Sequence, residues 1–207
     1  MMRSLRGAGL DPVVYGSVAR GDVTPNSDID VFISQVSSSF SLERAIEDGG
    51  FKSSCRVLVQ ATPNYALKGY IYVDERRSFS FPLTSLRIHE HQFYIFGGKL
   101  SYDGLESGKR VPGVNKGLRL IEPVEDGHIE SPVKGREEEV AGLLGVDVRT
   151  VRDRVRALTR RDKIGRTGVF LKRELSPDET FELVLKRLSD SIPAVRRKVR
   201  SSGSLTS

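Results

Sequence analysis

The chain has 207 residues, of which 38% are hydrophobic and 29% charged, a balance typical of a water-soluble protein with a buried core. Its formal net charge of +6 favours a polyanionic partner. A single cysteine, Cys55, excludes an internal disulfide framework and a cysteine-rich zinc site. Because no apolar run reaches the roughly 18 residues of a membrane-spanning helix and the first residues lack the apolar segment of a signal peptide, we expect a cytoplasmic protein.

The first informative stretch begins with an apolar run at residues 12–15, which predicts a short buried strand. Gly16 and Ser17 end this strand, and small residues at such a turn let backbone N–H groups approach a phosphate. The planar guanidinium of Arg20 is suited to phosphate oxygens. We therefore predict a phosphate-facing turn directly after the first strand.

A second strand is predicted at residues 28–33, after a turn that ends at Ser27. Because side chains alternate along a strand, Asp28 and Asp30 should project from the same face. Two neighbouring carboxylates repel each other unless a cation lies between them, and hard oxygen ligands suit Mg²⁺ or Mn²⁺. The sequence therefore predicts a divalent metal site formed by these two aspartates.

The order Gly-Ser, a short spacer and then Asp-x-Asp on a strand resembles the signature of the polymerase β-like nucleotidyltransferase superfamily. The stretch Ala19-Arg20-Gly21 and the serine before the carboxylates resemble the fuller form found in small prokaryotic members. The resemblance implies an α/β (α+β) nucleotidyltransferase fold with a short mixed sheet. It also implies an enzyme that transfers a nucleoside monophosphate from an NTP to an acceptor hydroxyl. In that enzyme the metal is held by Asp28 and Asp30 and the nucleotide by Gly16, Ser17, Arg20 and Ser27.

A β-hairpin is predicted at residues 69–83, where aromatic, polar and aliphatic residues alternate on both sides of a polar turn. The resemblance implies a third catalytic carboxylate on a strand that follows the Asp-x-Asp strand. The second hairpin strand, 78–83, offers only serines and phenylalanines at the candidate positions. Asp74 is the one candidate for the third catalytic acid, and its alternative interpretation is a solvated acid beside the turn.

The chain is predicted to form a nucleotidyltransferase domain at residues 1–104, followed by a glycine- and proline-rich linker or extension at 105–135. One strand is expected within that extension, at 118–121. A mainly helical domain with a C-terminal helix should occupy 136–200, and residues 201–207 should be a disordered tail.

The pattern in this last domain predicts a helix at 136–144, a glycine turn, a second helix at 148–158 and a two-stranded wing at 162–171. This order resembles the winged helix-turn-helix domains of prokaryotic regulators, which place their second helix in the major groove of DNA. The residues implied in nucleic-acid binding are Arg149, Thr150, Arg152, Arg156 and Arg166.

Two functions follow from these patterns. The first is metal-dependent nucleotidyl transfer to a nucleic acid, a small molecule or a protein, since some small prokaryotic members adenylylate a partner protein. The second is a DNA-binding winged-helix regulator whose nucleotidyltransferase domain is a nucleotide sensor or inactive. The predicted partners are an NTP, DNA or RNA and an acceptor protein, with no membrane, and a homodimer is among the states to test.

Overall fold

The computed structural model describes residues 1–165 and 168–203, and the chain passes back and forth between two compact units. Unit 1 consists of Met1–Pro12, Asp30–Arg87 and Val169–Ser207, and unit 2 consists of Val13–Ile29 and Ile88–Gly168. The limits of these units do not coincide with the boundaries predicted after residues 104 and 135. Both units contain helices and strands, so the predicted α/β class is confirmed.

The sheet of unit 1 has the strand order β10-β3-β4-β5-β2, in which the pairs β10–β3, β3–β4 and β4–β5 are antiparallel. The predicted hairpin is confirmed, because β4 and β5 pair with Tyr70 opposite Ser80 and Tyr72 opposite Ser78. Directly opposite residues of an antiparallel pair share one face of the sheet. The strands are β2 (Ile29–Ile33), β3 (Cys55–Gln60), β4 (Leu67–Tyr72), β5 (Arg77–Pro82) and β10 (Leu171–Glu174).

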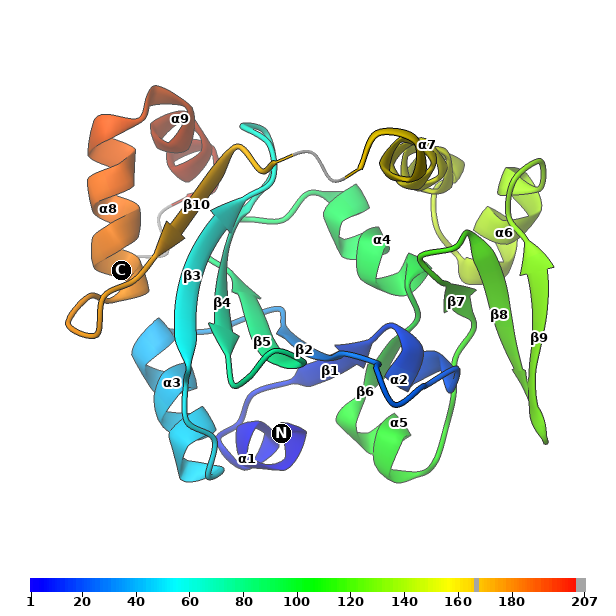
Figure 1. Ribbon diagram of the computed structural model, residues 1–207. Helices are drawn as coiled ribbons and strands as arrows, with labels where there is room; N and C mark the ends of the chain where they lie inside the picture. The colour runs from blue at the N-terminus through cyan, green and yellow to red at the C-terminus, as the bar shows by residue number, and fades with distance from the viewer. Residues whose placement is uncertain (166–167, 204–207) are drawn as a thin grey trace. The chain divides into compact units, whose positions relative to one another are not determined.

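Four helices complete unit 1, and the C-terminal pair α8 and α9 pack against each other (Figure 1). Phe181, at the start of α8, is fully buried and meets Phe81 of β5 edge to face, with ring centroids 5.1 Å apart. Gly69 of β4 leaves the space for this pair, since a Cβ atom there would lie 2.5 Å from the Phe81 ring. The helices are α1 (Met2–Gly7), α3 (Ser39–Asp48), α8 (Phe181–Ser191) and α9 (Pro193–Ser201).

Unit 2 contains a three-stranded antiparallel sheet, β7-β8-β9, whose apolar side chains share a core with two helices. Val114 and Leu120 from the sheet join Val140, Val151 and Leu158 from the helices in this core. The segment predicted as a linker or extension therefore forms strands here, and the strand expected at 118–121 is confirmed within β8. The elements are β7 (Gly113–Val114), β8 (Arg119–Val124), β9 (Gly127–Pro132), α6 (Glu137–Leu144) and α7 (Val148–Ile164).

The remaining elements of unit 2 surround the phosphate-facing turn predicted from sequence. The antiparallel pair β1–β6 places Val14 opposite Leu100, and both side chains are buried. These elements are β1 (Pro12–Tyr15), α2 (Ser17–Arg20), α4 (Ile88–Phe96), β6 (Lys99–Ser101) and α5 (Tyr102–Glu106). None of the helices in the described part of the chain combines the length and the apolar character needed to cross a bilayer.

Two helices joined by a glycine turn occupy the positions predicted for the first two helices of a winged helix, but the predicted wing is wrong. Helices α6 and α7 are joined through Gly145, which has the left-handed φ of 64° that favours glycine. Residues 162–164 continue α7, because no helix-breaking residue occurs before Gly165. The other arm of the predicted wing ends in β10, and β10 pairs with β3 in unit 1. Residues 166 and 167 lie outside the described residues.

Candidate functional site

The turn after β1, which the sequence predicts to face a phosphate, has a backbone conformation that requires glycine. Gly16 has φ 87° and ψ −148°, a region that is essentially restricted to glycine, and a Cβ atom there would meet nothing within 4 Å. Its N–H donates to the carbonyl of Gly98 at 3.0 Å, so the backbone N–H groups that remain for a ligand begin with Ser17. Gly16 therefore shapes this turn, and Ser17 is the residue that offers donors.

Arg20, predicted from its sequence position to bind phosphate, has its guanidinium group bonded within the protein. Its side chain is buried, with one guanidinium nitrogen donating to the carbonyl of Gly97 at 2.5 Å and another to Asp22 at 2.9 Å. The aliphatic part of the Arg20 side chain packs closely on Gly98, where an added Cβ atom would lie 2.6 Å from Cγ of Arg20. These contacts join α2 to the turn before β6, as expected for a residue that supports the site from within the fold.

Ser27 stabilises the turn that precedes the two aspartates. Its hydroxyl accepts a hydrogen bond from the N–H of Thr24 at 2.9 Å, and its own N–H donates to the carbonyl of Thr24 at 3.0 Å. Such side chain to backbone bonds fix tight turns. Ser27 therefore holds the turn that leads into Asp28.

Asp28 directly precedes β2, and its side chain is 46% exposed. The ammonium group of Lys116 lies 3.3 Å from one of its carboxylate oxygens. The loop that carries Lys116 is held in place from both sides. The side chain of Asn115 accepts from the N–H groups of Gly117 and Arg119, at 2.9 and 3.1 Å. Leu118 adopts a left-handed φ of 57° while its side chain is buried.

Asp30, the second residue of β2, is held by a group from the hairpin of unit 1. The hydroxyl of Ser78 donates to one carboxylate oxygen of Asp30 at 2.6 Å, and the side chain of Ser78 is buried. Ser80 lies two residues further on the same face of β5, also buried, and its hydroxyl has no hydrogen-bond partner among the described residues. The β5 face that reaches Asp30 therefore presents hydroxyl groups, and it carries no acid.

Two tyrosines of β4 complete this polar face of unit 1. The rings of Tyr70 and Tyr72 are stacked, with centroids 6.1 Å apart and planes 14° apart. Burial, followed by the nearby phenol of Tyr72 and the charge of Asp30, raises the pKa of Tyr70 to about 12. The pKa of Tyr72 is also raised, first by burial and then by Asp30. Both phenols therefore keep their protons at neutral pH, and Asp30 is the carboxylate they face.

Asp74, the predicted third catalytic acid, lies in the turn between β4 and β5. Its carboxylate accepts from the backbone N–H groups of Arg76 and Arg77, at 3.0 and 2.8 Å, and from Nε of Arg77 at 2.7 Å. The N–H of Arg76 first, and then the Arg77 side chain, lower the pKa of this carboxyl group. These are the contacts of a residue that stabilises a turn. Within the described residues, no three side chains of the types His, Cys, Asp and Glu form a group able to hold a metal ion.

Asp74→Asn should make the stability of the protein less dependent on acid pH. Because the folded-state pKa of Asp74 is lowered, its stabilising contribution is complete above the ordinary Asp pKa of about 3.9 and is lost as the pH falls through the folded value. The difference in free energy of unfolding between the wild type and the variant should therefore be largest near neutral pH and vanish in strong acid. Urea unfolding at a series of pH values measures it, with Glu75→Gln as the matched control. A difference that grows toward acid pH would contradict the assignment.

The residues predicted to bind nucleic acid separate into two groups. Thr150 is buried and its hydroxyl donates to Gln92 at 2.6 Å, so it is engaged inside unit 2. Arg152 forms an ion pair with Glu138 of α6. Arg149 and Arg156 are exposed, whereas Arg166 lies outside the described residues. Among those that the structure describes, Thr150 is therefore the one whose side chain is buried, and Arg152 is an exposed residue held by a surface ion pair.

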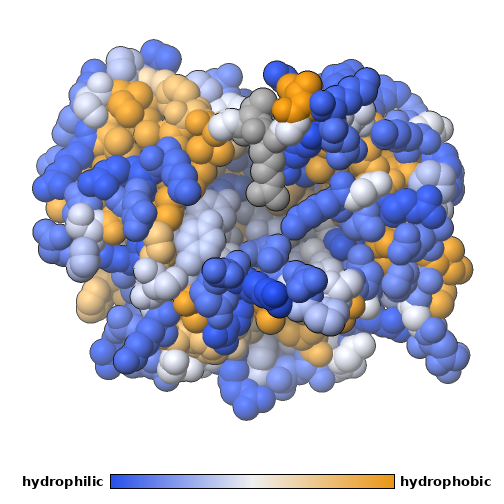
Figure 2. Space-filling view, viewed as in Figure 1, coloured by the Kyte–Doolittle hydropathy of each residue, from blue (hydrophilic) through white to orange (hydrophobic). Residues whose placement is uncertain are grey.

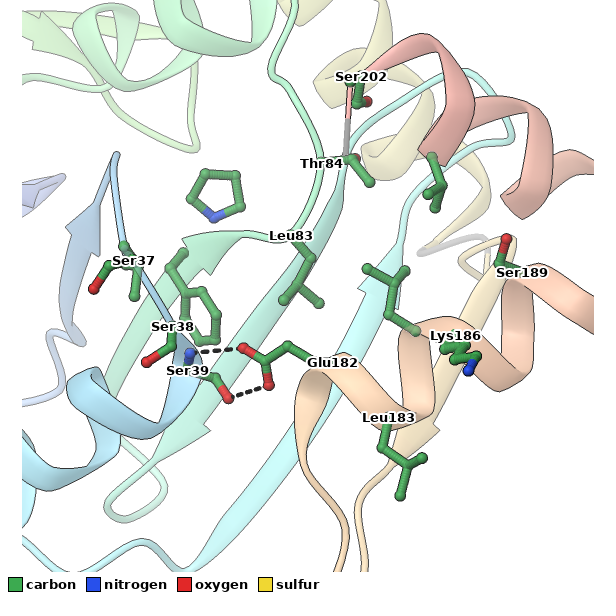
Figure 3. Close-up of a pocket in the computed structure, with 16 residues that line it drawn as sticks. Ser37, Ser38, Ser39, Leu83, Thr84, Glu182, Leu183, Lys186, Ser189 and Ser202 are labelled. Atoms are coloured by element: carbon green, nitrogen blue, oxygen red, sulfur yellow. Dashed lines mark hydrogen bonds between the residues drawn. The ribbon is translucent and has the colours of Figure 1, made fainter. Parts of the chain in front are cut away.

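A pocket of about 680 Å³ lies elsewhere in unit 1, between the end of β5 and helices α8 and α9 (Figure 3). Glu182 stands at its edge, and its two carboxylate oxygens accept from the N–H and the hydroxyl of Ser39, each at 2.7 Å. These bonds satisfy the first turn of α3 and join it to α8. None of the residues predicted for metal, nucleotide or nucleic-acid binding lines this pocket.

The sequence patterns missed two contacts of the paired aspartates. Ser78 and Lys116 are separated from their partners Asp30 and Asp28 by 48 and 88 positions. The alternation of serine and phenylalanine along 78–81 was the available signal for Ser78. The Asn-Lys-Gly sequence at 115–117 was the signal for a tight turn that presents a lysine.

Comparison with known proteins agrees with the N-terminal part of this description. No curated protein matches the chain, and no solved structure matches it. Residues 2–80, from α1 into β5, match the family model described as a nucleotidyltransferase domain. This domain indicates nucleotidyl transfer in general terms, with an NTP as the substrate. The match supports the nucleotidyltransferase superfamily for this part of the chain.

Proposed function

We propose that this protein transfers a nucleoside monophosphate from an NTP to an acceptor hydroxyl and releases pyrophosphate. The observation that carries the proposal is the carboxylate of Asp30, which lies within the matched segment and has one oxygen bonded to the buried Ser78. A carboxylate anchored in this way has a fixed orientation, which a metal ligand needs. Asp28 precedes it by two residues and supplies the second carboxylate.

The donor set suits Mg²⁺ or Mn²⁺. Magnesium is commonly bound by one or two protein carboxylates, and water and substrate phosphates complete its shell. Asp28 and Asp30 provide two such ligands, and the described residues add no third acid to them. When bound, the cation would neutralise phosphate charge and lower the pKa of the attacking hydroxyl. We infer that most of its remaining ligands come from the triphosphate, so that metal and nucleotide bind together.

The protein's own residues would then have separate tasks. Ser17 would donate its N–H and hydroxyl to the triphosphate from the turn that Gly16 shapes. Ser78 would hold Asp30 in a single orientation. Arg20 and Ser27 would support the two turns through their bonds to the backbone. The Asp74 carboxylate would fix the hairpin turn that carries Ser78 toward Asp30.

Lys116→Ala should raise the affinity for Mn²⁺ in the absence of nucleotide. The ammonium group competes with the metal for Asp28, and an exposed ion pair of this kind is worth up to about 1 kcal/mol, so the gain should be about two- to fivefold. Titration followed by the electron paramagnetic resonance signal of free Mn²⁺ measures it. Lys109→Ala removes another exposed charge of unit 2 and serves as the control. An equal gain in the control, or none in Lys116→Ala, would show that Lys116 does not compete for this site.

The experiment that tests the function is incubation with labelled ATP, CTP, GTP or UTP, Mg²⁺, and either total cellular RNA or lysate protein. Label should appear on an acceptor with the wild type and not with Asp30→Asn. Fractionation of the labelled product into RNA, protein and small molecules then identifies the acceptor class. Absence of label on every acceptor, with all four nucleotides, would reject transfer as the function.

A second candidate is a regulator in which the first domain binds a nucleotide as a sensor. The observation that favours it is Ser78, a hydroxyl at the β5 position that faces Asp30, where a third carboxylate would assist the chemistry. A sensor would bind an NTP with Mg²⁺ in equilibrium dialysis, lose that binding in Asp30→Asn and transfer no label. The two candidates therefore differ in the transfer assay and agree in the binding assay.

A further inference from the structure

The exposed face of α7 carries a row of cations that the nucleotidyltransferase chemistry does not use. Arg149, Arg156, Arg160 and Lys163 follow one another at intervals of seven, four and three residues, so a helix with 3.6 residues per turn places them on one face. All four are exposed. The opposite face, with Val151 and Leu158, is buried in the core of unit 2. We call these four cations the basic stripe.

The helix that carries the basic stripe has a net charge close to that of the whole chain. Helix α7 contains seven arginines and lysines and two aspartates, a balance of +5, whereas the whole chain has a net charge of +6. Hydrophilic residues dominate the surface over α7 (Figure 2). So much positive charge along one helix repels itself unless a polyanion lies beside it.

Most of the basic stripe has no counterion among the residues that the structure describes. Among residues 1–165 and 168–203, the side chains of Arg149, Arg160 and Lys163 form no ion pair. Arg156 is 3.4 Å from Asp153, the one acid that shares this face. Two of the three arginines of α7 outside the basic stripe are engaged differently, since Arg152 pairs with Glu138 and Arg154 stacks on Phe93 at 4.8 Å. The helix therefore uses some of its arginines for packing and leaves the basic stripe for solvent or a partner.

We propose that the basic stripe binds the phosphate backbone of double-stranded nucleic acid. From its first to its last cation the basic stripe spans 14 helical steps, or about 21 Å at 1.5 Å per residue. This length exceeds the roughly 12 Å width of the major groove of B-DNA, so a helix lying across the groove can reach phosphates on both of its sides. The straight row is rigid, because the other face of α7 is packed into a core, and it therefore suits a polyanion with regularly spaced charges.

Two further observations favour a duplex and contact with its backbone. Proteins that bind single strands stack bases on aromatic side chains, and α7 contains no aromatic residue. Base-edge recognition by a helix-turn-helix depends on the first residues of the second helix. Here Thr150 and the N–H of Asp147 are bonded to Gln92 of α4, at 2.6 and 3.2 Å. Two groups at the start of the helix are thus engaged within unit 2, and three of the four cations of the basic stripe lie beyond the first turn, which favours binding that does not depend on base sequence.

Binding by the basic stripe does not require nucleotidyl transfer. Asp30→Asn should bind a duplex as tightly as the wild type, so failure of the transfer assay and failure of duplex binding are separate results. If the protein both binds a duplex and transfers nucleotides, the duplex either supplies the acceptor hydroxyl or carries the molecule that does.

The test is fluorescence anisotropy with labelled DNA and RNA duplexes of mixed sequence, and with one of their single strands, over a series of KCl concentrations. The full-length Arg160→Gln/Lys163→Gln variant should bind duplexes roughly tenfold or more weakly. Its plot of log affinity against log salt should be shallower by about 1.8, since each phosphate contact contributes about 0.9. Arg197→Gln/Arg200→Gln removes the same charge from exposed positions of α9 and should leave binding within about twofold. Asp153→Asn removes the acid of this face and should tighten binding.

Each other outcome overturns the proposal. Equal losses in both double variants would mean that only net charge matters. Tighter binding of the single strand than of the duplex would assign the surface to a different partner. Strong preference for one duplex sequence, or no binding to any probe at low salt, would exclude a backbone-binding stripe. Asp153→Asn removes a charge and keeps the size of an exposed side chain. Its effect on duplex binding can therefore be interpreted even if a double variant folds poorly.

Discussion

Asp30→Asn is expected to lower the rate of nucleotidyl transfer about a thousandfold. The amide retains the shape of the side chain and an oxygen that can accept from Ser78, but it loses the negative charge that binds a divalent cation. A metal at a transferring phosphate stabilises charge by several kcal/mol, and about 1.4 kcal/mol corresponds to a factor of ten in rate. Single-turnover measurement of label transfer at saturating NTP and Mg²⁺ isolates this loss from changes in substrate binding.

The control for this variant is Asp48→Asn, which removes the charge of an exposed aspartate at the end of α3. Asp48 forms an exposed ion pair with Arg44 on the same helix, at 3.1 Å, and the substitution should leave the transfer rate within about twofold. Circular dichroism of both variants checks that they fold. A rate for Asp30→Asn within tenfold of the wild type would remove Asp30 from the metal site and with it the proposed mechanism.

Phe181→Ala is expected to destabilise unit 1 by about 3–5 kcal/mol, a large part of the stability of a domain of ordinary size. The ring is fully buried and meets Phe81 edge to face, so its removal leaves a cavity between α8 and the sheet. Gly69 cannot fill that cavity, since it has no side chain. Urea unfolding at neutral pH, followed by tyrosine fluorescence and circular dichroism, measures the change in the free energy of unfolding.

Leu183→Ala is the matched control, because it truncates an apolar side chain two residues along the same helix. Leu183 is 40% exposed, so its loss should cost under about 1 kcal/mol. Comparable losses in the two variants would show that the buried contact of Phe181 with Phe81 contributes no more than an exposed side chain of α8 does.

Features that depend on short stretches of sequence were predictable. The alternation of Tyr70, Ile71 and Tyr72 with the serines and phenylalanines of the next strand gave the hairpin, because period-two patterns report one buried and one polar face. The positions of α6 and α7 followed in the same way from the spacing of their apolar residues and from Gly145. The Asp-x-Asp strand was recognisable because its carboxylates and its apolar residues alternate.

Features that depend on tertiary contacts were not predictable. Nothing near Asp30 indicates that Ser78 will donate to it, and nothing near Arg20 indicates that its guanidinium will be bonded to Gly97. The wing prediction failed for the same reason. A short strand such as β10 carries no signal that distinguishes pairing with its sequence neighbours from pairing with β3, more than a hundred residues earlier. Side-chain partners of charged residues are therefore the part of the site that required the structure.

The alternation of the chain between the two units has a consequence for synthesis and folding. Strand β10 pairs with β3 at the edge of the sheet, where Val59 lies opposite Lys172. Because these partners are far apart in sequence, β3 leaves the ribosome long before β10. Until then its edge offers unpaired backbone groups, which in a nascent chain invite pairing with other strands. Contacts so distant in sequence also slow folding, because a long loop must close before they form. An expression fragment ending at residue 104 would keep this edge permanently open, and it should aggregate where the whole chain remains in solution.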